Sequence, residues 1–425
     1  MSARTLVLRA ALALAAALGL LAAAIAALNL RGESPIGHSL AAPAPASEAQ
    51  VERGRYLALA GNCAGCHTVR GGHAYAGGLG IETPFGVIYS SNLTPEPRTG
   101  LGAWNAEHFW RAMHNGRSRD GKLLYPAFPY TSFTRITRED SDALFAWLRT
   151  LAPVEQANRP DTLRFPYNTQ AALAVWRALY FTPSSFQPQP QRPAEWNRGA
   201  YLVGGLGHCI ACHGSRNAMG ATDLALGLAG GMLPGQGWYA PSLDSNAEAG
   251  VANWPADEVV QLLRTGRTRH ASVSGPMADV VHGSTQHLSD ADLRAMAAYL
   301  QALPVREAPV PGPRVQPSHS TMRLGEKVYA QQCAWCHGER GEGSTGAFPT
   351  LAGNRAVNLA NPANLVQTVR RGGYAPATEG NPRPDGMPPF GHVLGDDEIA
   401  AVLTFIRASW GNTGAEVTLR EAMRR

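Results

Sequence analysis

A five-residue pattern, Cys-x-x-Cys-His, occurs three times in this chain of 425 residues and uses all six of its cysteines. In a helix the two thiols lie one turn apart, where they can form thioethers with the two vinyl groups of a haem, and the imidazole that follows can ligate the iron. The pattern therefore predicts three covalently bound haems c. The predicted haem-binding residues are Cys63, Cys66, Cys209, Cys212, Cys333 and Cys336, with His67, His213 and His337 as iron ligands.

Two other uses of paired cysteines fit the pattern less well. A structural zinc site needs two Cys-x-x-Cys pairs about 12 to 20 residues apart, whereas these pairs lie more than 100 residues apart and come in threes. A redox-active dithiol needs only one pair and no histidine after it. Repetition of the whole pattern thus favours haem.

Length and charge agree with several haem domains. At 44% hydrophobic and 16% charged residues, the chain is long enough for two or three cores. The formal charge is +5, but three haems carry two propionates each, so the loaded protein would have a charge of 5 − 6 = −1. The basic composition is therefore no argument for nucleic acid as a partner.

The N-terminus has the charge order of an export sequence. Ala10 to Leu28 are 19 consecutive uncharged residues, preceded by Arg4 and Arg9. This run is longer than the apolar region of a cleavable signal and approaches the ~20 residues that span a bilayer. We expect an uncleaved membrane anchor. The alternative is a signal peptide removed near Ala44-Pro45-Ala46, and both interpretations place the protein at the periplasmic face of the membrane.

Three internal repeats surround the three motifs. Each repeat has a glycine eight to ten residues before its first cysteine, in a segment predicted to be the N-terminal helix of the repeat. Each also ends in an amphipathic helix with an aromatic residue at the same place, and we expect these aromatic residues to pack against the N-terminal helix. The glycines are Gly54, Gly199 and Gly325, and the aromatic residues are Trp147, Tyr299 and Phe405.

A middle helix in each repeat is predicted to end at a glycine suited to a left-handed C-cap, namely Gly116, Gly266 and Gly372. We therefore expect an all-α fold of three consecutive cytochrome c domains, each with a few helices around one haem, plus the N-terminal helix. The predicted order is signal or anchor 1–32, tether 33–47, domain one 48–153, connector 154–193, domain two 194–304, Pro-rich linker 305–318, domain three 319–412 and tail 413–425.

The connector contains an apolar segment, Ala171 to Phe181, that is too short to span a membrane. It is interpreted either as a packed connector helix or as an element that faces a partner or the membrane surface.

A second axial ligand is expected for electron-transfer haems, and a thioether sulfur raises the potential of the iron. Met387 lies in a Pro-rich loop before the last helix of domain three, and Met277 holds the same place in domain two. Prolines beside each methionine stiffen the loop that presents it. We predict Met277 and Met387 as the sixth ligands of haems two and three.

From Val51 to Asn412 the chain resembles the tri-haem cytochrome c subunit of bacterial membrane-bound dehydrogenases, such as quinohaemoprotein alcohol dehydrogenase and gluconate or sorbitol dehydrogenase. The resemblance is carried by the three haem motifs together with four further strings. These strings are Tyr89-Ser-Ser-Asn-Leu-Thr-Pro95, Leu124-Tyr-Pro-Ala-Phe-Pro-Tyr130, Ala174-Val-Trp-Arg177 and Leu403-Thr-Phe-Ile-Arg-Ala-Ser-Trp-Gly-Asn412.

One residue departs from that family pattern. The alcohol dehydrogenase subunits carry methionine in the Tyr-Pro-Ala-x-Pro-Tyr loop, where this chain has Phe128, which cannot ligate iron. Met113 is the only methionine inside domain one, at a helix position that the other repeats fill with core residues. The sixth ligand of haem one is therefore left between Met113, His114 and an open position.

The resemblance implies an electron-transfer subunit that passes electrons from a periplasmic dehydrogenase subunit to membrane quinone or a terminal oxidase. The sequence shows no catalytic triad, nucleotide loop or quinone-enzyme motif, so the organic chemistry is expected of a partner that holds pyrroloquinoline quinone, flavin or a molybdenum cofactor. Two alternatives are a free-standing multihaem electron shuttle and a haem enzyme that uses an open iron at haem one.

Overall fold

The computed structural model describes residues 3–33, 36, 45–307, 316–344 and 346–424. Its contacts divide the chain into two compact units. The first contains residues 1–54 and 71–186, and the second contains residues 55–70 and 187–425. Most of the predicted tether 33–47 and of the linker 305–318 lies outside the described residues.

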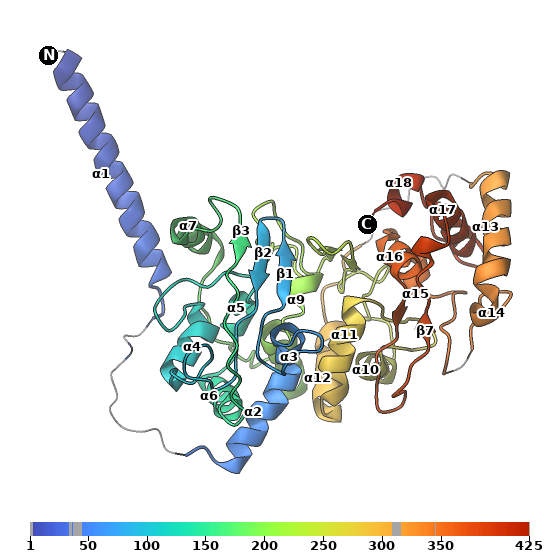
Figure 1. Cartoon of the computed structure of the whole chain (residues 1–425), viewed down its shortest axis with the longest axis horizontal. Coiled ribbons are helices and arrows are strands. Elements are labelled where there is room, and N and C mark those ends of the chain that lie inside the picture. Colours follow the sequence, from blue (N-terminus) through green and yellow to red (C-terminus); the bar gives the residue numbers. More distant parts are fainter. Residues whose placement is uncertain (1–2, 34–35, 37–44, 308–315, 345, 425) are drawn as a thin grey trace. The chain divides into compact units, whose positions relative to one another are not determined.

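The first unit combines helices with one small antiparallel sheet of order β1-β2-β3 (Figure 1). Helix α2 (Glu48–Ala60) begins in this unit and ends in the second. The other elements are α1 (Ala3–Asn29), β1 (Gly80–Thr83), β2 (Gly86–Tyr89), α4 (Ala106–Asn115), α5 (Tyr130–Phe133), α6 (Arg138–Leu148), β3 (Thr162–Leu163) and α7 (Gln170–Tyr180).

The second unit contains the three Cys-x-x-Cys-His motifs and two two-stranded ladders, β4-β5 and β6-β7. Its elements are α3 (Cys63–His67), α8 (Ala194–Tyr201), a π-helical turn η1 (Leu202–Leu206), α9 (Ile210–His213), β4 (Gly231–Met232), β5 (Tyr239–Ala240), α10 (Ala256–Thr265), α11 (Pro276–Gly283), η2 (Thr285–His287), α12 (Asp290–Gln301), α13 (His319–Gln332), α14 (Ala334–His337), α15 (Arg355–Asn358), α16 (Ala363–Arg371), β6 (Gly373–Tyr374), β7 (Gly386–Met387), η3 (Phe390–His392), α17 (Asp396–Ala408) and α18 (Leu419–Ala422).

Each repeat packs its first long helix against its last one, and a glycine makes the contact possible. A Cβ built on Gly54, Gly199 or Gly325 would lie 1.9, 1.9 or 2.2 Å from a backbone carbonyl oxygen of the closing helix. The same Cβ would lie 2.7 to 2.8 Å from the Cβ of Trp147, Tyr299 or Phe405. The predicted packing of the aromatic residues is thereby confirmed, and Figure 1 shows the α13–α17 pair side by side.

The first two repeats share an ion pair beside this glycine. Arg53 Nε donates to Asp140 at 2.7 Å, and Arg198 Nε donates to Asp292 at 2.8 Å. In both repeats the aspartate lies three residues after an N-cap hydroxyl, Thr137 or Ser289, which accepts a hydrogen bond from the backbone N–H of that aspartate. In the third repeat the residue before the glycine is Leu324.

Two sequence predictions need correction. All three turn glycines have positive φ, but only Gly116 and Gly266 adopt the left-handed helical conformation, whereas Gly372 has φ 65° and ψ −161°. The all-α expectation is also too narrow, because short antiparallel strands pair in both units. These strands occur where the chain crosses between helices and its backbone groups need partners outside a helix.

The second and third repeats contact each other directly within the second unit. The side chain of Asn364 accepts from the backbone N–H of Tyr239 and donates to its C=O, both at 2.8 Å. Arg355 Nη1 donates to Gly250 O at 2.6 Å, and its guanidinium lies 4.8 Å from the Trp254 ring. These repeats are therefore joined by side chains as well as by the linker.

Candidate functional site

The three Cys-x-x-Cys-His motifs form short helices, α3, α9 and α14, that follow the N-terminal helix of each repeat. In the first two motifs, the residue before the first cysteine has a positive φ, 47° at Asn62 and 38° at His208. All six cysteines are free thiols. Each motif thus presents two thiols about one helical turn apart, the spacing required for attachment to two vinyl groups.

The motif histidines His213 and His337 are each oriented by a carbonyl oxygen. His213 Nδ1 lies 2.7 Å from Pro241 O, and His337 Nδ1 lies 3.1 Å from Pro349 O. Because a carbonyl can only accept, Nδ1 carries the proton and the lone pair of Nε2 is free to ligate a metal. Burial lowers the pKa of both imidazoles, which favours the neutral form that binds iron.

The thiols are held in their protonated form. Burial raises the pKa of Cys63 and of Cys209 to about 12, and that of Cys333 to about 11. Zinc is bound by thiolates, so protonated thiols do not favour a zinc site. Within the described residues, no group of three or more His, Cys, Asp or Glu side chains is placed to hold a metal ion. The two cysteines and the following histidine of each motif are the donor set that haem c requires.

Met277 begins a helix and does not lie in the loop that the sequence analysis expected. It is the second residue of α11, it is partly buried, and the preceding Gly275 has φ 52°. A Cβ on Gly275 would lie 2.5 Å from the ring of Trp238, which immediately precedes β5. The same β4-β5 region contacts the haem motif, because Gly230 N donates to His213 O at 2.8 Å. One hairpin thus holds both the His213 segment and the Met277 segment.

Met387 occupies the corresponding place in the third repeat. It lies on β7, where it pairs with Gly373 of β6, and a Cβ on Gly372 would lie 2.3 Å from its carbonyl oxygen. The partly buried side chains of Met387 and Cys333 pack against the same hydrophobic core. The end of the middle helix therefore fixes the methionine loop near the third motif.

The two candidate ligands for haem one, Met113 and His114, lie in the first unit together with Phe128. Met113 is 5% exposed on α4, as a core residue would be. His114 is also buried, and its ring stacks on Trp110 with centroids 4.4 Å apart. Phe128 belongs to an aromatic cluster, with its ring centroid 5.4 Å from that of Phe133. His67 belongs to the second unit, so the sixth ligand of haem one stays a prediction.

The first and second haem motifs are neighbours within the second unit, which the sequence analysis did not foresee. Ser284 Oγ donates to Ala60 O at 3.2 Å, and a Cβ on Gly61 would lie 3.2 Å from the Leu206 side chain. Burial, and then the nearby thiol of Cys212, raise the pKa of Cys66. The two attachment segments therefore lie against each other.

A polar clasp reinforces this contact. The hydroxyl of Tyr56, on α2, donates to Asp292 Oδ2 at 2.7 Å, and Asp292 also accepts from Arg198. Tyr56 stands two residues after Gly54 in the first repeat, and Tyr201 stands two residues after Gly199 in the second. The sequence repeat alone could not distinguish a tyrosine that packs within its own repeat from one that bridges to the next.

Comparison with known proteins finds cytochrome matches over the segments that contain the three haem motifs. The family model described as "Cytochrome c" matches residues 51–152 and 197–304, and the model "Cytochrome C oxidase, cbb3-type, subunit III" matches residues 320–406. The chain is similar to the cytochrome c subunit of alcohol dehydrogenase (quinone) from Komagataeibacter europaeus, with 39% identity over 90% of this chain and 86% of the relative.

Two further relatives belong to other dehydrogenases. The gluconate 2-dehydrogenase cytochrome c subunit of Pantoea cypripedii is 39% identical over 88% of each chain. A nicotinate dehydrogenase subunit of Pseudomonas putida is 44% identical over 85% of this chain, which spans only 30% of the length of that relative. The same kind of chain thus occurs with dehydrogenases of different substrates.

Proposed function

Because the chain belongs to the family of cytochrome c subunits of dehydrogenases, we propose that it binds three haems c and carries electrons from a catalytic dehydrogenase subunit to an acceptor in the membrane. The observation that best supports this proposal is that all three attachment motifs follow the same type of helix, while two of them lie against each other. Two haems bound at neighbouring motifs would be close enough to exchange electrons, and this function needs no substrate pocket.

The residues of this chain would hold and tune the haems. Each cysteine pair would fix one haem covalently, and His67, His213 and His337 would each supply one axial nitrogen. Met277 and Met387 would supply sulfur at haems two and three. Haem c, once attached, supplies an iron that cycles between the ferrous and ferric states. The carbonyls of Pro241 and Pro349 would keep Nε2 of His213 and His337 aimed at that iron.

The catalytic partner would oxidise a small organic substrate with pyrroloquinoline quinone, flavin or a molybdenum cofactor. The relatives are named for alcohol, gluconate, fructose and nicotinate dehydrogenases, so the family serves more than one substrate class. The acceptor would be membrane quinone or a terminal oxidase. We also propose the domain limits 48–153, 194–304 and 319–412 for the three haem domains.

We further propose that the protein is exported and anchored at the periplasmic face of the membrane. Helix α1 has 27 residues with a mean hydropathy of 2.5 in its most apolar window, which is long and apolar enough to cross a bilayer. A signal peptide would pass the same test. Membrane fractionation after a high-salt wash separates the two, because an anchored chain stays with the membrane and a cleaved one is released.

A second candidate function follows from Phe128. With phenylalanine in the loop and Met113 in the core, haem one would keep an open coordination position unless His114 ligates its iron, and an open position is the starting point for a haem enzyme. Binding of carbon monoxide or cyanide to one haem in three would support an open position, and catalysis at that haem would have to be shown separately.

Purification of the tagged protein from native membranes tests the main proposal. We expect a dehydrogenase subunit to co-purify, substrate to reduce the haems, and the intact mass to exceed the polypeptide by three haems. The variant Cys209→Ala/Cys212→Ala should lose one haem and keep two. A mass increase of two haems in the wild type would eliminate one motif, and bound zinc in place of iron would overturn the proposal. Isolation without any dehydrogenase would instead favour a free-standing shuttle.

A further inference from the structure

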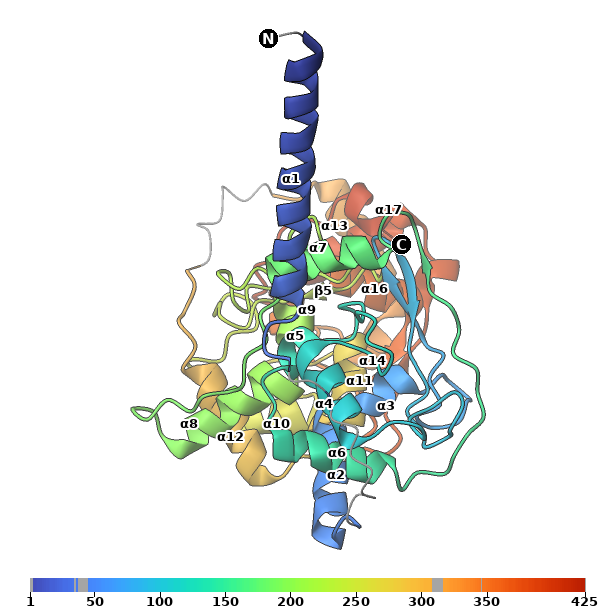
Figure 2. The same cartoon turned by 90° about the vertical axis from the view of Figure 1, so that its left-hand side faces the viewer.

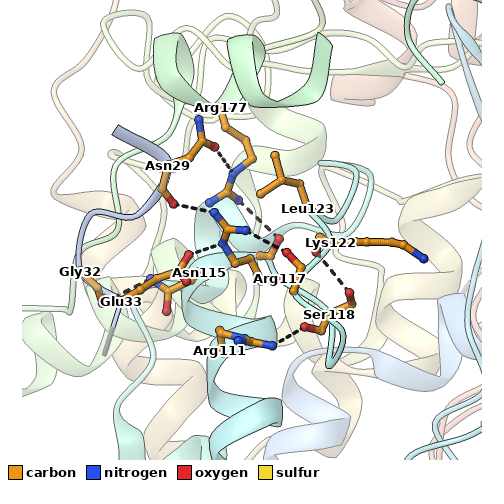
Figure 3. A network of polar contacts seen from close by, with 12 residues as sticks. Asn29, Gly32, Glu33, Arg111, Asn115, Arg117, Ser118, Lys122, Leu123 and Arg177 are labelled. Carbon is orange, nitrogen blue, oxygen red and sulfur yellow. Dashed lines mark hydrogen bonds and ion pairs between the residues drawn. The ribbon is translucent and has the colours of Figure 1, made fainter. Parts of the chain in front are cut away.

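The polar end of α1 is built into the first unit. Asn29 is 6% exposed, and its Nδ2 donates to Ala174 O of α7 at 2.9 Å. Its Oδ1 accepts from Arg177 Nε at 3.0 Å (Figure 3). The apolar helix therefore ends in a residue whose whole amide side chain is used in contacts with α7 and with α1 itself.

A shielded ion pair follows directly. The Glu33 carboxylate pairs with Arg117, and the two side chains are only 12% and 15% exposed. Arg117 also donates to Asn29 O at 3.1 Å and to Gly121 O at 2.8 Å. Figure 3 shows the Arg117 guanidinium lying between the end of α1 and the loop after α4. We call Asn29, Glu33, Arg117 and Arg177 the polar lock.

Arg177 and Arg117 take some of their polar contacts from the N-terminal segment. Arg177 is 2% exposed, and its guanidinium has the Asn29 amide oxygen as a hydrogen-bond acceptor, with the rings of Tyr130 and Phe181 about it. Removing the chain before residue 34 would take away Asn29 and Glu33 together. Arg117 would then lose its carboxylate partner and keep the carbonyl of Gly121, and Arg177 would lose the Asn29 oxygen and keep the more distant carbonyl of Gly116, which is unfavourable for largely buried charged groups.

Helix α7 is apolar on its outer face as well as on its inner face, where Leu173 and Trp176 are buried. Ala171, Val175 and Leu179 lie one turn apart on its outer face, and Val175 and Leu179 are 43% and 66% exposed. Its one charged residue, Arg177, points inward. If the outer face of α7 met water, a charged residue such as Arg177 would be expected on that face and Leu179 on the inner face. The outer face is therefore suited to an apolar environment.

The contacts of α1 and α7 favour the lipid bilayer as the environment that covers the outer face of α7. No part of the most apolar stretch of α1 is buried in the protein, and its end packs on α7. Figure 2 shows α7 running across the lower end of α1. Leu28, in the last turn of α1, and Leu30, directly after α1, are both exposed. A bilayer that surrounds α1 would therefore meet the outer face of α7.

We propose that the polar lock keeps α1 as a permanent part of the mature protein and seats the outer face of α7 on the surface of the bilayer that α1 enters. This inference rests on the proposed membrane anchoring and is independent of the proposed electron transfer. It makes the first unit a part of the protein with a defined orientation toward the membrane.

Spin labels on the full-length protein in lipid nanodiscs test the orientation, with the haems reduced. A cysteine introduced at Leu179 would carry the label, and one at Val393, which is 62% exposed in the third repeat, is the matched control. We expect relaxation by oxygen, which concentrates in lipid, to dominate at Leu179, and relaxation by a water-soluble nickel complex to dominate at Val393. Equal access at both positions would overturn the proposal. So would protection of Leu179 that appears only when a dehydrogenase subunit is added.

Two measurements test the lock. The intact mass of the purified protein should include residues Asn29 to Glu33, and a mature N-terminus after Glu33 would overturn the inference. Glu33→Gln should reduce the contrast between oxygen and nickel access at Leu179. Asp120→Asn is the control, because it removes the charge of an exposed carboxylate in the same unit whose partners, Lys122 and Ser118, are not members of the polar lock. An unchanged contrast in Glu33→Gln would show that the lock does not hold α7, whatever the haem count.

Discussion

Replacement of Gly199 by alanine should destabilise the second unit, although alanine is the better helix former. A Cβ at this position would lie 1.9 Å from the carbonyl oxygen of Ala295, where an ordinary C···O contact is about 3.3 Å. The helices α8 and α12 would have to separate by about 1.4 Å. A gap of ~1 Å already removes up to half of the dispersion attraction between two atoms.

The balance of two effects sets the magnitude. A methyl group forced into a packed interface costs ~3 kcal/mol when the obstacle is backbone and cannot rotate away. The gain from replacing glycine with alanine in a helix is ~1 kcal/mol. We therefore expect the free energy of unfolding to fall by ~2 kcal/mol, equivalent to a decrease in Tm of roughly 4–8 °C for a unit of this size.

Thermal unfolding followed by circular dichroism measures the change, and Gly380→Ala is the control. No atom would lie within 4 Å of a Cβ on Gly380, so its stability should stay within ~0.5 kcal/mol of the wild type. Gly325→Ala should behave like Gly199→Ala, since its Cβ would lie 2.2 Å from a carbonyl oxygen. If Gly199→Ala melts at or above the wild-type temperature, the helices are not in the close contact described above.

Three further predictions concern single residues. Met277→Ala and Met387→Ala should each keep the haem attached and lower the potential of one haem in a redox titration, because the sulfur that favours ferrous iron is lost; unchanged potentials would exclude these methionines as ligands. Met113→Ala should lower stability by ~2–4 kcal/mol and leave the haem spectrum unaltered, as expected for a core residue; loss of a low-spin centre would make Met113 the ligand of haem one. Burial raises the pKa of Asp292, but the bonds from Arg198 and Tyr56 outweigh it and lower the pKa overall. The stability that Asp292 contributes is present above its unfolded pKa and is lost as the pH falls through the lowered one, so Asp292→Asn should be less stable than wild type at pH 7, and in denaturant titrations the difference should shrink as the pH falls through the lowered pKa.

The repeats could be predicted from the sequence because their signals are local or periodic. The haem motifs, the glycines of the N-terminal helices and the aromatic residues of the closing helices recur at fixed positions, and the structure places Gly199 against the α12 segment that carries Tyr299. The N-caps Thr137 and Ser289 follow from the same local rules.

Contacts between distant segments could not be predicted in this way. Nothing in the residues around Tyr56 shows that its hydroxyl reaches Asp292, which lies 236 positions away. Asn29 and Glu33 look like the ordinary polar end of an export sequence until their partners Arg177 and Arg117 are known. The short strands were missed because segments of two to four residues carry too little periodicity to be recognised.

The side-chain contacts of Asn364 and Arg355 with the second repeat have a consequence for how the chain could be cut. A protease that cleaves the Pro-rich linker would break the covalent connection between the second and third repeats but leave these contacts in place. The two fragments should migrate together in native gel filtration and separate only in denaturant. The linker would then raise the effective concentration of the two repeats for each other during folding. Once the repeats are in contact, their side-chain contacts would keep them together without it. Asn364 also pairs with Tyr239, two residues before the carbonyl that orients His213, so the nicked protein should keep the ligand geometry of its second haem.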